Sequence, residues 1–97
     1  MNELTKIKIG TSVDLSIHTQ QNLYTFPSDG YVYLHGDDGN TSTLYLFDTN
    51  NTSIGTMNTT MGTSSWWGHN LVFVKKGLKA YGQNTGANCS VVYKPFN

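Results

Sequence analysis

The sequence predicts an all-β protein, a small antiparallel β-sandwich. Residues that suit a pleated strand, such as Val, Ile, Thr and the aromatic types, recur along the whole chain in short runs with a period of two. Small polar and turn-forming residues separate these runs, since Thr, Asn, Gly and Ser occur 13, 10, 10 and 8 times among 97 residues. Good helix formers are scarce, with two Ala, one Glu and no Arg.

The first third of the chain contains three expected strands. Residues 6–9 and 13–18 alternate apolar and polar side chains, which is the period of a half-buried strand. Residues 23–26 form a third run, and Pro27 ends it because proline donates no backbone hydrogen bond to a sheet. Turn residues at 28–30 then lead into the next strand.

The middle of the chain predicts a hairpin. Residues 31–35 and 41–47 are expected to pair, because the Asp-Gly step in the segment 36–40 tolerates a positive φ. The second of these strands places two sets of side chains on opposite faces, which are Thr43, Tyr45 and Phe47 on one and Leu44 and Leu46 on the other.

The second half of the chain repeats the alternation of strand and turn. We expect a turn at 48–52, a weak strand at 53–58 and a polar loop at 59–65. Strands at 70–75 and 78–83 flank the basic turn Lys75-Lys76-Gly77, interpreted as a solvated hairpin end, and the last strand covers 89–93. The total of eight or nine strands is typical of sandwiches and barrels.

Length and charge limit the range of functions. A chain of 97 residues has room for one small core, so residues 1–97 are taken as a single domain with 1–5 as a flexible N-terminal segment. Six Lys balance six acidic residues, and no clustered basic footprint indicates nucleic acid as a partner. No apolar run suits membrane insertion, and the N-terminus lacks the apolar core of a signal peptide. The single cysteine, Cys89, excludes an intrachain disulfide and is expected to be buried and inert.

The segment Trp66-Trp67-Gly68-His69 is the best candidate for a binding site. Adjacent strand residues face opposite ways, so we expect one indole in the core and the other outside. An exposed indole is a flat apolar platform for a sugar ring, with His69 and the loop acids Asp37 and Asp38 as polar contacts. The alternative buries both Trp66 and Trp67, one in the sandwich and one between subunits, where Trp is enriched.

Metal and catalytic chemistry have little support in the sequence. Asp37 and Asp38 fit a hairpin turn better than a calcium loop, which needs several spaced oxygen ligands. His18, His35 and His69 are far apart and lack zinc-binding spacing, so no metal or other cofactor is expected. No nucleophile elbow or phosphate loop is present, and the acids cluster in turns. The chain is therefore not expected to be an enzyme.

Three segments resemble a known family: PSDGYV at 27–32, FVKKGLKAY at 73–81 and SVVYKPF at 90–96. In this order they look like the C-terminal head domains of bacteriophage tail-fibre and baseplate proteins, over residues 24–97. Such heads are jelly rolls, similar in outline to the tumour-necrosis-factor and C1q group, and they are usually trimeric. The family supplies no universal ligand residues, and the segment 66–69 is not part of the shared pattern. The resemblance implies an isolated head or a short free-standing relative.

The resemblance implies a non-enzymatic receptor-binding head in a virion tail, which recognises bacterial surface saccharides as a homotrimer. Four tyrosines, Tyr31, Tyr33, Tyr45 and Tyr81, are more than a small core needs, and this excess favours a face buried between subunits. An alternative is a purely structural trimerisation or virion-decoration domain without a ligand. A further alternative, an esterase or glycosidase, would need two carboxylates that face each other across a cleft.

Overall fold

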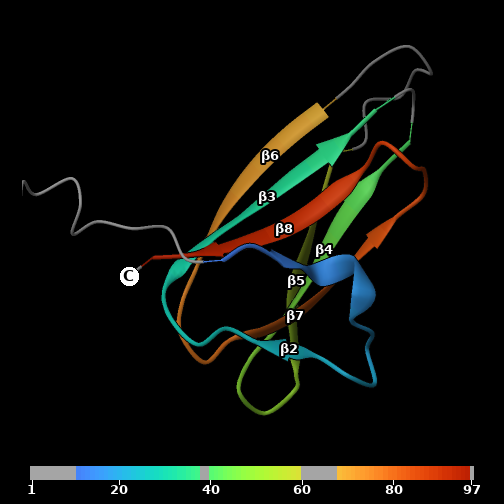
Figure 1. The fold of residues 1–97 in the computed structure, drawn as a ribbon. Coiled ribbons are helices and arrows are strands. Elements are labelled where there is room, and N and C mark those ends of the chain that lie inside the picture. The colour runs from blue at the N-terminus through green and yellow to red at the C-terminus, as the bar shows by residue number, and fades with distance from the viewer. Residues whose placement is uncertain (1–10, 38–39, 60–67, 97) are drawn as a thin grey trace, which may run out of the picture.

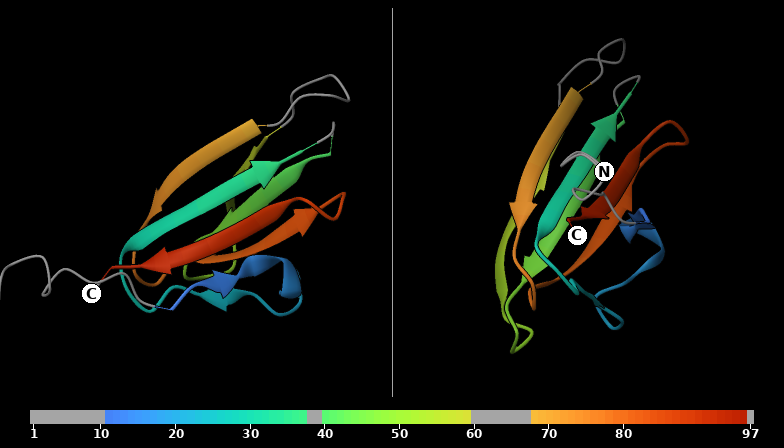
Figure 2. Two further views of the ribbon diagram at one scale, coloured as in Figure 1. Left: turned by 45° about the horizontal axis from the view of Figure 1, so that its top comes forward. Right: turned by 60° about the vertical axis from the view of Figure 1, so that its left-hand side comes forward.

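The computed structural model describes residues 11–37, 40–59 and 68–96 and has two four-stranded antiparallel sheets. The strand order is β1-β8-β3-β6 in the first sheet and β2-β7-β4-β5 in the second. Figures 1 and 2 show the sheets as two layers, with β8, β3 and β6 side by side in one of them. The predicted all-β, sandwich-like fold is confirmed. The expected strand at 6–9 and the expected flexible segment 1–5 lie outside the described residues.

Most strands fall where the alternation of side chains predicts them. The described elements are β1 (Val13–Asp14), η2 (Leu15–Ile17), β2 (Tyr24–Thr25), β3 (Gly30–Gly36), β4 (Ser42–Phe47), β5 (Ser53–Asn58), β6 (Gly68–Val74), β7 (Lys79–Asn84) and β8 (Ser90–Pro95). Within these described elements the only helix is the three-residue η2, so none is long and apolar enough to cross a membrane.

The core lies between the two sheets, because β3, β4, β7 and β8 direct alternate side chains inward, whereas the edge strand β5 is exposed along its whole length. In β3 the inward residues Val32 and Leu34 are fully buried, whereas Tyr31, Tyr33 and His35 are only partly buried. The buried cluster combines residues of both sheets and of the segments that connect them: Leu15, Phe26, Val32, Leu34, Leu44, Val74, Ala80, Val91 and Tyr93. This shared core holds the sheets face to face.

The strand expected over residues 13–18 is shorter than predicted. Pairing with β8 ends at Asp14, and the chain continues as the 3-10 helix η2. The carboxylate of Asp14 explains the change, because it accepts hydrogen bonds from both the backbone N–H and the hydroxyl of Ser16. The turn buries Leu15 in the core and leaves Ile17 largely exposed.

Two expected hairpins connect different sheets instead. Strands β3 and β4 flank the turn after Gly36, yet β3 pairs with β6 and β8, while β4 pairs with β5 and β7. The basic turn likewise joins β6 of the first sheet to β7 of the second. Each of these strands has one apolar face, and packing the two faces across the core buries more apolar surface than pairing the strands edge to edge.

The basic turn is fixed by contacts with the connection between β2 and β3. The carboxylate of Asp29 accepts a 2.9 Å hydrogen bond from the backbone N–H of Lys76. Gly77 has a φ of 91°, which favours glycine, and its N–H donates to the carbonyl oxygen of Phe26 at 2.9 Å. The two connections therefore support one another at the same end of the sandwich.

A buried polar network closes the opposite end. Ser42 is fully buried, and its hydroxyl lies 2.5 Å from the carbonyl oxygen of His35 and 2.8 Å from the side-chain oxygen of Asn84. Its backbone N–H donates to the hydroxyl of Thr59 at 3.1 Å. These contacts join β3, β4, β7 and the residue after β5. Cys89, expected to be buried, is half-buried and directly precedes β8.

Candidate functional site

The structure describes two of the five residues that the sequence predicts as a site. Trp66, Trp67 and Asp38 lie outside the described residues, so their roles remain predictions. Asp37 is half-buried in the turn after β3, where its carbonyl oxygen accepts a 2.9 Å hydrogen bond from the N–H of Asn40. His69 is exposed on β6, and its register partner across the sheet is His35 of β3. Asp37 and His69 thus belong to the same end of the first sheet.

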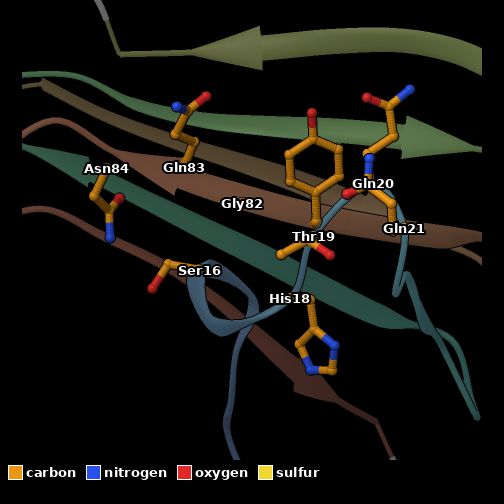
Figure 3. Close-up of a pocket in the computed structure, with 9 residues that line it drawn as sticks. Ser16, His18, Thr19, Gln20, Gln21, Gly82, Gln83 and Asn84 are labelled. Carbon is orange, nitrogen blue, oxygen red and sulfur yellow. The ribbon is translucent and has the colours of Figure 1, made fainter.

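A groove on another part of the molecule has the form of a ligand site. It lies between the segment 16–21 and β7, and it has a volume of about 500 Å³. The groove exists because β2 pairs only with Lys79 and Ala80, so the rest of β7 lies beside the segment that contains η2. Figure 3 shows this segment running alongside β7.

The groove is lined by hydroxyl, amide and ring groups that carry no fixed charge. The lining residues are Ser16, His18, Thr19, Gln20, Gln21, Tyr81, Gly82, Gln83 and Asn84. Amides and hydroxyls both donate and accept hydrogen bonds, which matches the requirements of a polyhydroxylated, uncharged ligand. A lining without lysine or carboxylate offers no counter-charge to an anion or a metal ion.

Tyr81 supplies an aromatic ring whose position is fixed by its neighbours. Its ring stacks on that of Tyr45, the directly opposite residue on β4, with centroids 4.6 Å apart and planes inclined by 12°. The hydroxyl of Tyr45 in turn donates a 3.1 Å hydrogen bond to the amide oxygen of Gln83. This bond orients the Gln83 amide, and its NH₂ group keeps donor capacity for a ligand.

Gln83 and Asn84 both line the groove, but their side chains make different contacts. As neighbours on a strand they point to opposite sides, as Figure 3 shows. The side-chain oxygen of Asn84 accepts from buried Ser42, whereas Gln83 is exposed on the outer face of the second sheet. Asn84 therefore anchors the groove to the buried network, while Gln83 faces outward.

His18 also lines the groove. Its ring packs edge-on against Tyr24, with centroids 5.2 Å apart. Its Nδ1 atom is buried and has no hydrogen-bond partner among the described residues. A tautomer with the proton on Nε2 leaves only an acceptor unmatched, which costs less than an unmatched donor. We therefore expect Nε2–H to be the polar group that His18 offers to a ligand.

The outer face of the first sheet is a second unusual surface. On it lie Leu71 and Phe73 of β6, which are 51% and 72% exposed, and Phe96, which is 40% exposed. The rings of Phe96, Tyr31 and Phe73 are neighbours, with centroid distances of 5.8 Å from Phe96 to Tyr31 and 6.4 Å from Phe96 to Phe73. Exposed apolar patches of this kind commonly mark protein interfaces. We call the cluster of Tyr31, Leu71, Phe73 and Phe96 on this surface the aromatic face.

Sequence patterns gave little sign of the groove, and the excess of tyrosines did not show which face of the sandwich would be exposed. The groove combines residues 16–21 with 81–84, and Gln and Asn side chains are too common in this chain to mark those positions. The aromatic rows in β3 and β6 were visible as strand-spaced residues, but only the sheet register shows that they share one face. Comparisons of the chain with protein-family models, curated proteins and solved structures gave no match.

Proposed function

We propose that this chain is a non-enzymatic attachment head that binds a saccharide in the groove beside Tyr81. The observation that carries the proposal is the lining of the groove, where an aromatic ring lies among amide and hydroxyl groups without a fixed charge. The C–H face of a sugar ring packs against aromatic rings, and its hydroxyls exchange hydrogen bonds with amides. The likeness to phage tail-fibre heads suggests a bacterial surface glycan as the source of that saccharide.

We further propose that the sandwich is a jelly roll. The pairs β4–β5, β3–β6, β2–β7 and β1–β8 nest around one another in sequence order. Such nesting arises when one long hairpin rolls up into two sheets, and jelly rolls are eight-stranded double sheets of this type. The proposal thus has support from the strand pairing as well as from the sequence resemblance.

We also propose that the head functions as a homotrimer within a virion tail. The aromatic face provides an apolar surface that a neighbouring copy would remove from water, since exposed Phe73 and Leu71 both lie on it. Three copies of a shallow, polar groove on one rigid body would bind a repeating glycan with greater avidity than one copy alone. Weak single-site binding is therefore compatible with firm attachment.

A printed array of bacterial polysaccharides tests the saccharide proposal. The wild-type protein should give a signal that Tyr81→Ala and Gln83→Ala both abolish. Asn88→Ala is the matched control, because this exposed amide does not line the groove and the variant should bind normally. Loss of signal in Trp66→Ala or Trp67→Ala, with both groove variants unaffected, would instead place the ligand at the indoles.

The main alternative is a purely structural trimerisation or decoration domain, and its support is the aromatic face alone. It predicts a trimer in solution together with no array signal for any glycan. The proposed attachment head is also a trimer, so the glycan array is the measurement that separates the two alternatives.

A further inference from the structure

The outer face of the first sheet holds a pair of histidines that the sequence keeps 34 residues apart. His35 of β3 and His69 of β6 are register partners, so their side chains emerge next to each other on the same face. The Nδ1 atoms of the two rings are 3.3 Å apart, and the ring centroids are 4.7 Å apart. The hydroxyl of Tyr33 also hydrogen-bonds to Nδ1 of His69.

We propose that His35 and His69 together bind a divalent first-row metal ion, and Zn²⁺ in particular, through their Nδ1 atoms. Two imidazole nitrogens at about 2.0–2.1 Å from a tetrahedral zinc ion lie about 3.3–3.4 Å from each other. The observed separation of 3.3 Å equals that distance. Imidazole is a good ligand for zinc, copper and nickel.

A simple hydrogen bond between the rings accounts less well for this geometry. Strong hydrogen bonds from N–H groups have donor–acceptor distances of about 2.7–3.2 Å, so a separation of 3.3 Å is long. In addition, Nδ1 of His69 meets two neighbours, Nδ1 of His35 and the hydroxyl of Tyr33, around one proton position. A metal ion can take the place of that proton because each deprotonated ring nitrogen carries a lone pair, and on binding it would displace the Tyr33 hydroxyl from Nδ1 of His69.

The backbone supports this pair as a site. Each residue is the last but one at the paired end of a seven-residue strand, and the register holds from the Gly30–Val74 pair to the Gly36–Gly68 pair beside them. The His35 carbonyl oxygen is also fixed from behind by the hydroxyl of buried Ser42, at 2.5 Å. Ligands carried by rigid strands lose little freedom on binding, which favours chelation. Among the described residues, no His, Cys, Asp or Glu joins the pair as a third ligand, so water would complete the coordination.

The three histidines of the chain provide a matched experiment. We would titrate Zn²⁺ into the metal-free protein by isothermal calorimetry and compare wild type with His35→Gln, His69→Gln and His18→Gln. Wild type and His18→Gln should each bind one zinc ion per chain with equal affinity. Loss of either proposed ligand should weaken binding by at least about tenfold, since loss of a second-shell partner alone costs about 10- to 100-fold.

A second measurement uses the wild-type protein alone, so it does not depend on whether the variants fold. Imidazole nitrogen spectra of the wild-type protein should show zinc-induced shifts at Nδ1 of His35 and His69, and none at His18. The proposal is overturned if the wild type binds no zinc, if all three variants bind zinc equally, or if zinc shifts only the His18 resonances. These outcomes do not depend on saccharide binding in the groove, so the zinc site and the saccharide proposal fail or succeed separately.

Discussion

The hydroxyl of Tyr93 donates a hydrogen bond of 2.6 Å to the backbone carbonyl oxygen of Ser28, which lies 65 residues earlier in the chain. Tyr93 is fully buried, and its ring packs on Phe26 with centroids 4.6 Å apart. Close by, the N–H of Phe96 donates to the carbonyl oxygen of Asp29 at 2.8 Å. The last strand is thereby attached to the connection that carries the chain from β2 to β3.

Tyr93→Phe should therefore destabilise the protein by about 1–2 kcal/mol, because it leaves a part-buried carbonyl oxygen without its donor while the ring is retained. Urea unfolding followed by circular dichroism would measure the change in the free energy of unfolding. Tyr45→Phe is the control, since its hydroxyl bond to Gln83 is exposed and should contribute less. Equal losses in the two variants would contradict the anchoring role of Tyr93.

Gly82 of β7 packs directly against Val91 of β8, in the other sheet. A Cβ atom at Gly82 would lie 2.7 Å from the Cβ atom of Val91, a stiff, fully buried residue. Gly82→Ala should therefore force the sheets apart and lower the free energy of unfolding by about 1–3 kcal/mol. Chemical denaturation would show the loss as a lower midpoint with an unchanged slope.

Gly86→Ala is the matched control for this overpacking. The two nearest atoms to its added Cβ belong to the amide group of Asn40, which can rotate away, and the Asn40 Cβ atom follows at 2.9 Å. Its loss of stability should be clearly smaller than that of Gly82→Ala. The reverse order would show that the contact between the sheets at Gly82 and Val91 is not the tight point.

Strand positions were predictable here because alternation of side chains depends only on local sequence. Residues 31–35, 41–47 and 53–58 fall within one residue of β3, β4 and β5. The sheet to which each strand belongs was not predictable, because the turns after Gly36 and Val74 suit a hairpin as well as a crossing between sheets. Asp14 shows a second limit of prediction from sequence. The alternation of apolar and polar side chains continues past Asp14, but the hydrogen bond from the Ser16 N–H to the Asp14 carboxylate ends the strand there.

The candidate sites depend on long-range register, which explains why the sequence indicated His69 but not its partner His35, and neither residue of the Tyr45–Tyr81 contact as part of a binding site. The His35–His69 pair and the contact of Tyr45 with Tyr81 both arise from direct cross-strand pairing. Neither pair has a spacing that a motif would detect. Trp66 and Trp67 were prominent only through residue type, and their role remains a prediction.

The aromatic face leads to a prediction about assembly. If sister copies cover this face, Phe73→Asp should convert the trimer into a monomer, because a buried unpaired carboxylate is strongly unfavourable. Light scattering should give three times the chain mass of 10.7 kDa for the wild type and the chain mass itself for the variant.

Ile17→Asp provides a close control for that experiment. Ile17 is 73% exposed and Phe73 is 72% exposed, but Ile17 belongs to η2 and not to the aromatic face. This variant should remain trimeric. A wild-type protein with the mass of a single chain would remove the trimer from the proposal, and dissociation of both variants would show that the aromatic face is not specific.

Tyr24 predicts how the protein responds to alkaline pH. Burial, and to a lesser degree the charge of a deprotonated Tyr93, raises the pKa of Tyr24 above its ordinary value of 10.0. A group whose pKa is higher in the folded state holds its proton more tightly there, so its stabilising contribution is complete below pH 10 and disappears as the pH rises through the folded-state pKa.

Tyr24→Phe keeps the ring that packs against His18, Phe26 and Tyr93 but has no proton to lose. The free energy of unfolding of the wild type should therefore fall more steeply than that of Tyr24→Phe above pH 10, measured by urea unfolding at closely spaced pH values. A difference between the two proteins that stays constant from neutral to alkaline pH would show that Tyr24 does not couple its proton to folding.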